Sequence, residues 1–155
     1  MRDWKRSTRE CAFDGLQQDM RGAISKHIAD YNLGDVLAGS LMCVETTSDK
    51  MKKDPLGGGE KNVVVVAIIT ARWLIWAIRG DRPGVTVMSA RLADVVIQDY
   101  ATTQFARMVP DTGFEVSGSF TDVSERGAAF IGLGQEPPAR RFKQTVIDAV
   151  QAAKT

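Results

Sequence analysis

The sequence predicts an α+β fold that is mainly β: a small antiparallel barrel or sandwich, closed by one C-terminal helix and preceded by one N-terminal helix. Two observations support this prediction. Strand-like apolar segments separated by turns succeed one another from residue 40 to residue 133, and a single amphipathic helical pattern occupies residues 137–153. We therefore divide the chain of 155 residues into an N-terminal helical extension, residues 1–39, and one domain, residues 40–155, a size that can bury one core.

A helix is predicted over residues 7–31. Side chains that can face an apolar surface recur there at spacings of three and four. They are Phe13, Leu16, Met20, Ala23, Ile24, His27, Ile28 and Tyr31. Ser7 or Thr8 could cap the start of the helix, whereas Gly15 and Gly22 weaken it. We therefore expect this helix to need a surface on which to pack.

Seven strands are predicted from runs rich in β-branched and aromatic residues that are bounded by turn signals. They span residues 40–47, 63–69, 73–79, 85–89, 93–100, 114–120 and 128–133. The polar, glycine-rich segment 48–62 predicts a long loop after the first strand, and the run Gly-Asp-Arg-Pro-Gly at residues 80–84 predicts a turn. Pro137 and Pro138 then suit the first turn of the last helix, where their missing N–H groups are not needed.

The overall charge is balanced, with 20 Lys and Arg against 19 Asp and Glu and a formal net charge of +1. Binding to nucleic acid through phosphates usually requires a clear basic excess, so we expect no nucleic-acid partner. Cys11 and Cys43 form no CxxC pair and no metal-ligand spacing. The sequence leaves open both a disulfide between them and a pair of reduced, buried thiols, and the second is the commoner state.

Residues 63–78 form the one stretch that could be mistaken for a membrane span. A spanning helix needs about 20 apolar residues, whereas this stretch is shorter and contains Arg72. Its four consecutive valines favour a strand. Because the charged N-terminus also lacks the apolar core of a secretory signal, we expect a cytoplasmic protein, either free or peripheral to the inner face of the membrane.

Two local patterns and the order of the elements carry a resemblance to a known family. One pattern is the hairpin Thr-Ala-Arg-Trp-Leu-Ile-Trp at residues 70–76, and the other is the run Val-Met-Ser-Ala-Arg-Leu-Ala-Asp at residues 87–94. With seven strands and a helix over residues 40–153, they resemble the pleckstrin-homology-like superfold, in particular the bacterial pleckstrin-homology-like and GRAM-type domains. The resemblance implies two nearly orthogonal sheets whose open corner is plugged by the C-terminal helix. It also implies a non-enzymatic domain that binds lipid headgroups, peptides or other proteins.

A basic cluster in the long loop is the candidate binding site. It consists of Lys50, Lys52, Lys53 and Lys61, with Arg82 in the nearby turn. The resemblance places these loops at the ligand-binding end of the barrel, which implies a site for an anionic headgroup or an acidic partner. Strand 63–69, however, lacks the basic residues that hold inositol phosphates in lipid-binding members. A solvated loop is the alternative, because acidic residues lie among the lysines: Asp49, Asp54 and Glu60.

Apolar residues on both faces of the central strands predict an interface. Trp73 and Trp76 are three residues apart in one strand, so they point to opposite faces. One should enter the core, and the other should meet the N-terminal helix or a partner subunit. Phe13, Leu16 and Met20 of that helix are the expected cover, within one chain or swapped between subunits. Because unpaired edges and two-faced apolar strands favour self-association, we expect a homo-oligomer.

Patterns for catalysis, metal binding or cofactor binding are missing from the sequence. It has no phosphate-loop or dinucleotide fingerprint, and its single histidine, His27, falls on or beside the apolar stripe of the N-terminal helix. We therefore expect a non-catalytic interaction or scaffold module, without a cofactor, that binds a protein partner or itself. A carrier or enzyme that uses the barrel interior would require an internal polar cavity.

The alternative function is that of a peripheral membrane module. It would contact anionic lipid headgroups through the basic loop and through residues near the N-terminus. These residues are Arg2, Trp4, Lys5, Arg6 and Arg9.

Overall fold

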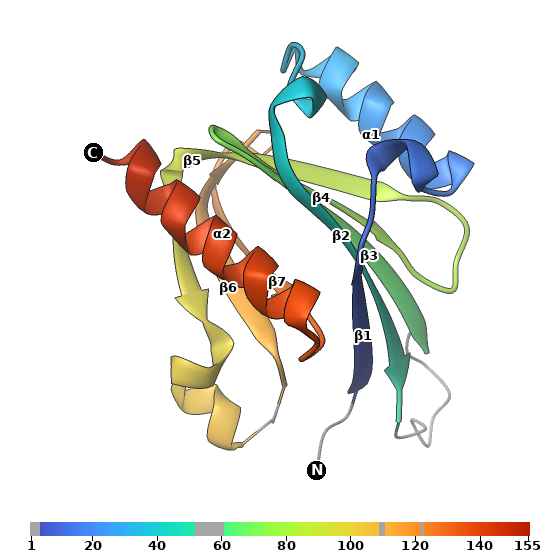
Figure 1. Ribbon diagram of the computed structural model, residues 1–155, viewed down its shortest axis with the longest axis vertical. Helices are drawn as coiled ribbons and strands as arrows, with labels where there is room; N and C mark the ends of the chain where they lie inside the picture. The colour runs from blue at the N-terminus through green and yellow to red at the C-terminus, as the bar shows by residue number, and fades with distance from the viewer. Residues whose placement is uncertain (1–3, 52–60, 109–110, 122) are drawn as a thin grey trace.

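Seven antiparallel strands form one sheet that curls into a half-barrel, with one helix across its open side and a second on its outer face (Figure 1). The computed structural model describes residues 4–51, 61–108, 111–121 and 123–155. The strands are β1 (Trp4–Glu10), β2 (Ser40–Lys50), β3 (Asn62–Thr70), β4 (Trp73–Arg79), β5 (Thr86–Asp99), β6 (Gly113–Phe120) and β7 (Arg126–Gly132). The helices are α1 (Gln18–Asp30) and α2 (Pro137–Ala153). The predicted class, mainly β with one helix near each end of the chain, is confirmed.

Each strand pairs with the next strand along the chain, in the order β1-β2-β3-β4-β5-β6-β7. All of these pairings are antiparallel. The strands β1 and β7 are therefore the two edges of the sheet. Short 3₁₀ segments complete the connections at Phe13–Gly15, Leu37–Gly39, Tyr100–Thr102 and Gln104–Arg107.

The start of the predicted N-terminal helix is wrong. Residues 4–10 form the edge strand β1, and α1 begins only at Gln18. The burial of β1 alternates: Arg6 and Thr8 are more buried than Lys5, Ser7 and Arg9. Ser7 and Thr8 resemble a helix cap in sequence, but they pair with Thr47 and Thr46 of β2, which lies far away in the chain. This part of the N-terminal extension is thus built into the sheet.

The two strands predicted at residues 85–89 and 93–100 are one long strand, β5, with a register irregularity between Ala90 and Val95. Gly118 of β6 lies opposite this irregularity, with a φ of 145°. A Cβ atom at Gly118 would lie 2.2 Å from the carbonyl oxygen of Asp94. Only glycine tolerates both this backbone conformation and so close an approach, so Gly118 allows β5 to bend while it stays paired.

The main core lies on the concave face of the sheet, beneath α2. Trp76, Phe114 and Phe142 are its largest fully buried side chains. The ring of Trp76 meets that of Phe120 edge to face, with centroids 5.2 Å apart and an interplanar angle of 83°. The apolar stripe predicted for the last helix is confirmed, because Phe142, Val146, Ala149 and Val150 are buried here. The concave side of the half-barrel is therefore filled by side chains.

A second apolar cluster lies on the convex face, between the sheet and α1. Leu16, Met20 and Ile24 pack there against buried residues of β2, β3 and β4, and Trp73 lies at its edge. Trp76 and Trp73 thus occupy opposite faces, as predicted. The cover for the two-faced apolar strands is α1 of the same chain, so these strands require no second copy of the protein.

Among the residues that the structure describes, neither helix combines the length and the apolar character that crossing a membrane would require.

Candidate binding groove

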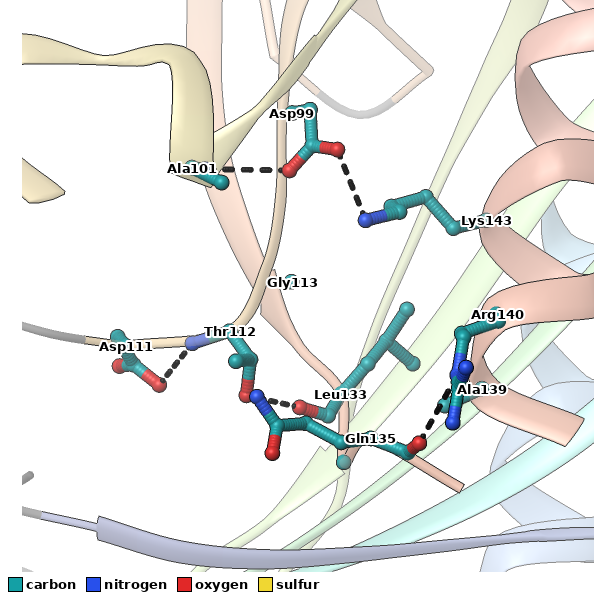
Figure 2. A pocket seen from close by; sticks show the side chains of 11 residues that line it. Asp99, Ala101, Asp111, Thr112, Gly113, Leu133, Gln135, Ala139, Arg140 and Lys143 are labelled. Carbon is teal, nitrogen blue, oxygen red and sulfur yellow. Dashed lines mark hydrogen bonds and ion pairs between the residues drawn. The ribbon is translucent and has the colours of Figure 1, made fainter. Parts of the chain in front are cut away.

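A groove of about 430 Å³ opens beside the first turns of α2 (Figure 2). Its walls come from three segments that are far apart in the sequence: the end of β5 and the segment after it, the start of β6, and the β7–α2 connection with α2 itself. The lining residues are Asp99, Ala101, Asp111, Thr112, Gly113, Leu133, Gly134, Gln135, Ala139, Arg140 and Lys143. The lining is mixed, with charged and polar groups around Leu133 and Ala139.

One wall of the groove is held by Arg6, which bridges β1 to the segment before β6. Its Nε and Nη2 atoms donate to the two carboxylate oxygens of Asp111, both at 2.7 Å, and its Nη1 atom donates to Ser48 at 2.7 Å. The guanidinium also lies 5.4 Å from the ring centroid of Trp4 and 5.5 Å from that of Phe130. A bidentate pair of this kind fixes both the distance and the orientation of its partners. Arg6 therefore joins the two edges of the sheet, where β1 and β7 form no ladder.

Close packing at this junction leaves no space for a side chain at position 132 of β7. A Cβ atom at Gly132 would lie 2.5 Å from the guanidinium carbon of Arg6. Thr8 of β1 accepts a hydrogen bond from the backbone N–H of Gly134 at 2.8 Å. The β7–α2 connection is thus anchored on β1, which sets the position of the groove.

Glu136 completes the junction at the start of α2. Its Oε2 atom accepts hydrogen bonds from the Ser7 hydroxyl at 3.0 Å and from the Thr8 backbone N–H at 3.1 Å. Burial by itself raises the pKa of Glu136, but hydrogen bonds from its own backbone, Ser7 and Thr8 outweigh this and hold the pKa below its usual 4.5. The ionised carboxylate therefore stabilises the fold by satisfying donors on the edge strand.

This role predicts a pH-dependent effect of the substitution Glu136→Gln. Since the folded-state pKa is depressed, the stabilisation is complete above the usual value of 4.5 and is lost as the pH falls through the folded-state pKa. We expect the variant to be less stable than wild type by about 1–2 kcal/mol at pH 7 and nearly equal to it near pH 3. Urea unfolding at both pH values measures this difference. The exposed Glu115→Gln is the control; an equal deficit of Glu136→Gln at both pH values would contradict the role.

The two cationic side chains of the groove, Lys143 and Arg140, differ in their ion pairing. Lys143 forms an ion pair with Asp99 at 2.8 Å, and Asp99 also accepts from the Ala101 backbone N–H at 3.1 Å (Figure 2). Arg140 is exposed, and its Nε atom donates only to the backbone carbonyl of Gln135 at 3.1 Å. Within the described residues, Arg140 forms no ion pair. The groove can therefore offer a guanidinium to an incoming carboxylate.

The segment between β5 and β6, which supplies part of the groove wall, also carries an exposed methionine and a half-buried tyrosine. Met108 lies in the segment between β5 and β6 that supplies part of the groove wall, and its exposed fraction is 81%. Tyr100 in the same segment contacts Phe130 of β7, with ring centroids 5.2 Å apart. Aromatic residues, methionine and arginine are enriched at protein interfaces, so this segment and Arg140 carry residue types that are typical of one.

The structure places three of the five predicted basic residues, Lys50, Lys61 and Arg82, on neighbouring segments. Asp81 in the β4–β5 turn accepts hydrogen bonds from the backbone N–H groups of Lys61 at 2.6 Å and Asn62 at 3.2 Å. The loops that carry Lys61 and Arg82 therefore lie side by side, and both side chains are exposed, while Lys50 is half-buried. The Asp81 carboxylate lies beside the backbone of Lys61, and Lys52 and Lys53 lie outside the described residues.

The five residues predicted to form an interface are buried or half-buried in the two apolar clusters of this chain. Leu16, just before α1, is 3% exposed and Met20, on α1, is 0% exposed; both pack on the convex face of the sheet, where Phe13 and Trp73 are half-buried. Trp76, 1% exposed, belongs to the core on the opposite face.

His27 lies in a buried hydrogen-bond chain that the sequence does not reveal, because its partner is 62 residues away. Its Nε2 atom is 2.8 Å from the Ser89 hydroxyl, which donates to the Thr121 hydroxyl at 2.7 Å. Thr121 in turn donates to the backbone carbonyl of Ser89. Since both hydroxyl protons are committed, His27 Nε2 donates to Ser89. This polarity is the reverse of a Ser–His dyad, in which the serine donates to the imidazole. The chain instead ties α1 to β5.

Sequence reasoning named Arg6 only as an expected lipid contact, and it did not identify Asp99, Asp111, Arg140 or Lys143 as parts of a site. No local signal marks Arg6 as pointing inward, because residues 4–10 have few β-branched residues and form a strand by pairing with β2. In the described part of the chain, no group of three or more His, Cys, Asp or Glu is placed to hold a metal ion. Comparison of the chain with protein-family models, with curated proteins and with solved structures found no match.

Proposed function

We propose that this protein is a non-catalytic interaction module with a pleckstrin-homology-like fold, and that it binds a protein partner through the groove beside α2. One observation carries the proposal: an open groove, whose Arg140 forms no ion pair with any residue that the structure describes, lies next to a half-barrel whose interior is filled by side chains. A ligand must then be bound at the surface. The seven-stranded meander followed by a C-terminal helix supports the family assignment, with α1 as an insertion between β1 and β2.

The chemistry of the groove favours a protein segment with an acidic residue beside apolar ones. Arg140 supplies a guanidinium that can hold a carboxylate in two parallel hydrogen bonds. The start of α2 adds a favourable potential for negative charge. Leu133 and Ala139 offer apolar contact, and Met108 is an exposed, flexible apolar side chain on the segment between β5 and β6. Such a mixture of one charged anchor and apolar surroundings is typical of transient protein interfaces.

A different protein is a better occupant than a second copy of this chain. The main reason to expect self-association was the apolar character of both faces of the central strands, and α1 covers the outer face. Light scattering at micromolar concentration measures this point. A homo-oligomer that dissociates on substitution of Arg140 would make the chain its own partner through the same groove.

Charge reversal at Arg140 tests the proposal. Wild type and the variant Arg140→Glu, both immobilised, are used to capture proteins from the source cells, and bound proteins are quantified by mass spectrometry. We expect at least one protein to be captured by wild type and depleted about tenfold or more with Arg140→Glu, since loss and reversal of a charge at a contact costs a few kcal/mol. Because Arg140 lies near the N-terminus of α2, glutamate there should not unfold the helix.

The matched control is Lys26→Glu on the exposed face of α1, which breaks only an exposed pair with Asp30. Equal capture by wild type and both variants would contradict binding at the groove.

Co-sedimentation of the full chain with anionic phosphatidylserine vesicles at low salt tests the membrane alternative. That alternative loses one of its expected contacts, because Arg6 is 11% exposed and paired with Asp111.

A further inference from the structure

The two cysteines lie in contact at the end of the β1–β2 ladder. The register that pairs Glu10 with Val44 continues by one residue, and the Cys11 N–H donates to the Cys43 carbonyl at 3.0 Å. The two Sγ atoms are 3.2 Å apart. Both thiols are free, although the chain between them includes the whole of α1. A disulfide bond requires a sulfur–sulfur separation of about 2.05 Å, so a small side-chain movement would close it.

A cavity gives a small molecule access to this pair. It has a volume of about 310 Å³, and both Cys11 and Cys43 line it. Cys11 is half-buried, whereas Cys43 is 6% exposed. A small oxidant can therefore reach Cys11 first, while Cys43 is shielded from solvent behind it.

The surroundings also make the two thiols chemically unequal. The hydrogen bond from Cys43 lowers the pKa of Cys11, and the positive charge of Arg9 acts in the same direction, against burial and the charges of Glu45 and Glu10. The same hydrogen bond and burial raise the pKa of Cys43 well above its ordinary value. Cys11 is also the more exposed of the two thiols that line the cavity, so its position favours it as the nucleophile, whose thiolate is the reactive form, with Cys43 as the resolving thiol.

We propose that Cys11 and Cys43 form a redox site in which a hydroperoxide converts the two thiols into an intramolecular disulfide. The Cys11 thiolate attacks one oxygen of the peroxide; an S–O bond forms, the O–O bond breaks, and the released hydroxide or alkoxide takes a proton to leave as water or alcohol. The Cys43 sulfur then attacks the Cys11 sulfenic acid. The S–S bond forms, the S–O bond breaks, and the departing hydroxide takes the Cys43 proton to form water. Two electrons pass from the two thiols to the peroxide.

The disulfide would close a ring that contains α1. Cross-linking restricts the unfolded chain, and a ring of about 30 residues is expected to raise the melting temperature by roughly 10 °C. The bond would also fix the end of β1 on β2 and limit the movement of α1 over the convex face. This effect depends only on the cysteine site, so it stands or falls independently of the groove.

Hydrogen peroxide is the probe in the first experiment. The reduced wild-type chain is treated with peroxide, and free thiols, the intact mass without reductant and thermal unfolding are measured. We expect both thiols to disappear together, with the loss of two hydrogens from the monomer mass. The melting temperature should rise, and dithiothreitol should reverse every change. Oxidation of one cysteine to sulfinic acid while the other stays free, disulfide-linked dimers, or retention of both thiols would overturn the proposal.

Single substitutions test the order of the two steps. In Cys43→Ser, peroxide and dimedone should together label Cys11, because its sulfenic acid has no resolving thiol. In Cys11→Ser, labelling of Cys43 should be at least about tenfold slower, in line with its shielded and protonated thiol. Equal labelling rates in the two variants would overturn the assignment of Cys11 as the attacked residue. The wild-type measurements decide the disulfide itself even if a variant fails to fold.

Discussion

Replacing Trp76 with alanine is expected to destabilise the protein by about 3–5 kcal/mol, the usual cost of deleting a fully buried aromatic side chain. Trp76 is 1% exposed in the core between the sheet and α2, and the substitution also removes its edge-to-face contact with Phe120. Urea unfolding followed by far-UV circular dichroism measures the change in the free energy of unfolding.

Trp76→Phe is the informative control. The indole Nε1 atom of Trp76 is buried and has no hydrogen-bond partner among the residues that the structure describes, and a buried donor in that state is unfavourable. Phenylalanine removes the unsatisfied group along with part of the ring, so the two effects offset, and we expect a loss of less than about 2 kcal/mol. A loss as large as that of the alanine variant would show that the indole nitrogen is satisfied in solution.

Replacing Arg6 with methionine is expected to cost about 3–5 kcal/mol, because it leaves Asp111 as a poorly solvated, unpaired carboxylate. The side chains of Arg6 and Asp111 are 11% and 15% exposed, and the substitution also removes the donor to Ser48. Adding Asp111→Asn to this variant should recover part of the loss, since no charge is then left unpaired. Urea unfolding of the two single variants and the double variant measures the coupling energy.

The strand itself supplies the matched control for this prediction. Arg9 also lies on β1 and pairs with Glu45 at 3.0 Å, but its side chain is 60% exposed. Arg9→Met should therefore cost at most about 1 kcal/mol. If Arg6→Met and Arg9→Met destabilise the protein equally, Arg6 does not join the two edges of the sheet in solution.

The sequence predicted those elements whose signal is local. The start of α2 at Pro137, the turn at residues 80–84 and the central strands each follow from residues that are neighbours in the chain. The opposite directions of Trp73 and Trp76 follow from the alternation of a strand, and the structure confirms them. The edge strand β1 was missed because it has few β-branched residues and is defined by its pairing with β2.

The groove depends on contacts that no local pattern encodes. Arg6 and Asp111 are 105 residues apart in the chain, and the lining comes from three separate segments. The cysteine pair also depends on a long-range contact, because two residues that are 32 positions apart meet only when β1 pairs with β2. The burial of Arg6 also changes the expected membrane contacts, since a cation that looks free in the sequence is enclosed between two aromatic rings.

The most direct test of the proposed function is to map the binding surface on the folded protein. ¹⁵N-labelled protein is titrated with the partner captured by wild type, and backbone amide shifts are followed by NMR. We expect the largest shifts in the residues that line the groove: Asp99, Ala101, Asp111, Thr112, Gly113, Gln135, Arg140 and Lys143. Shifts confined to the loops of Lys50, Lys61 and Arg82, or to α1, with the groove unchanged, would contradict the proposal that this protein binds its partner beside α2.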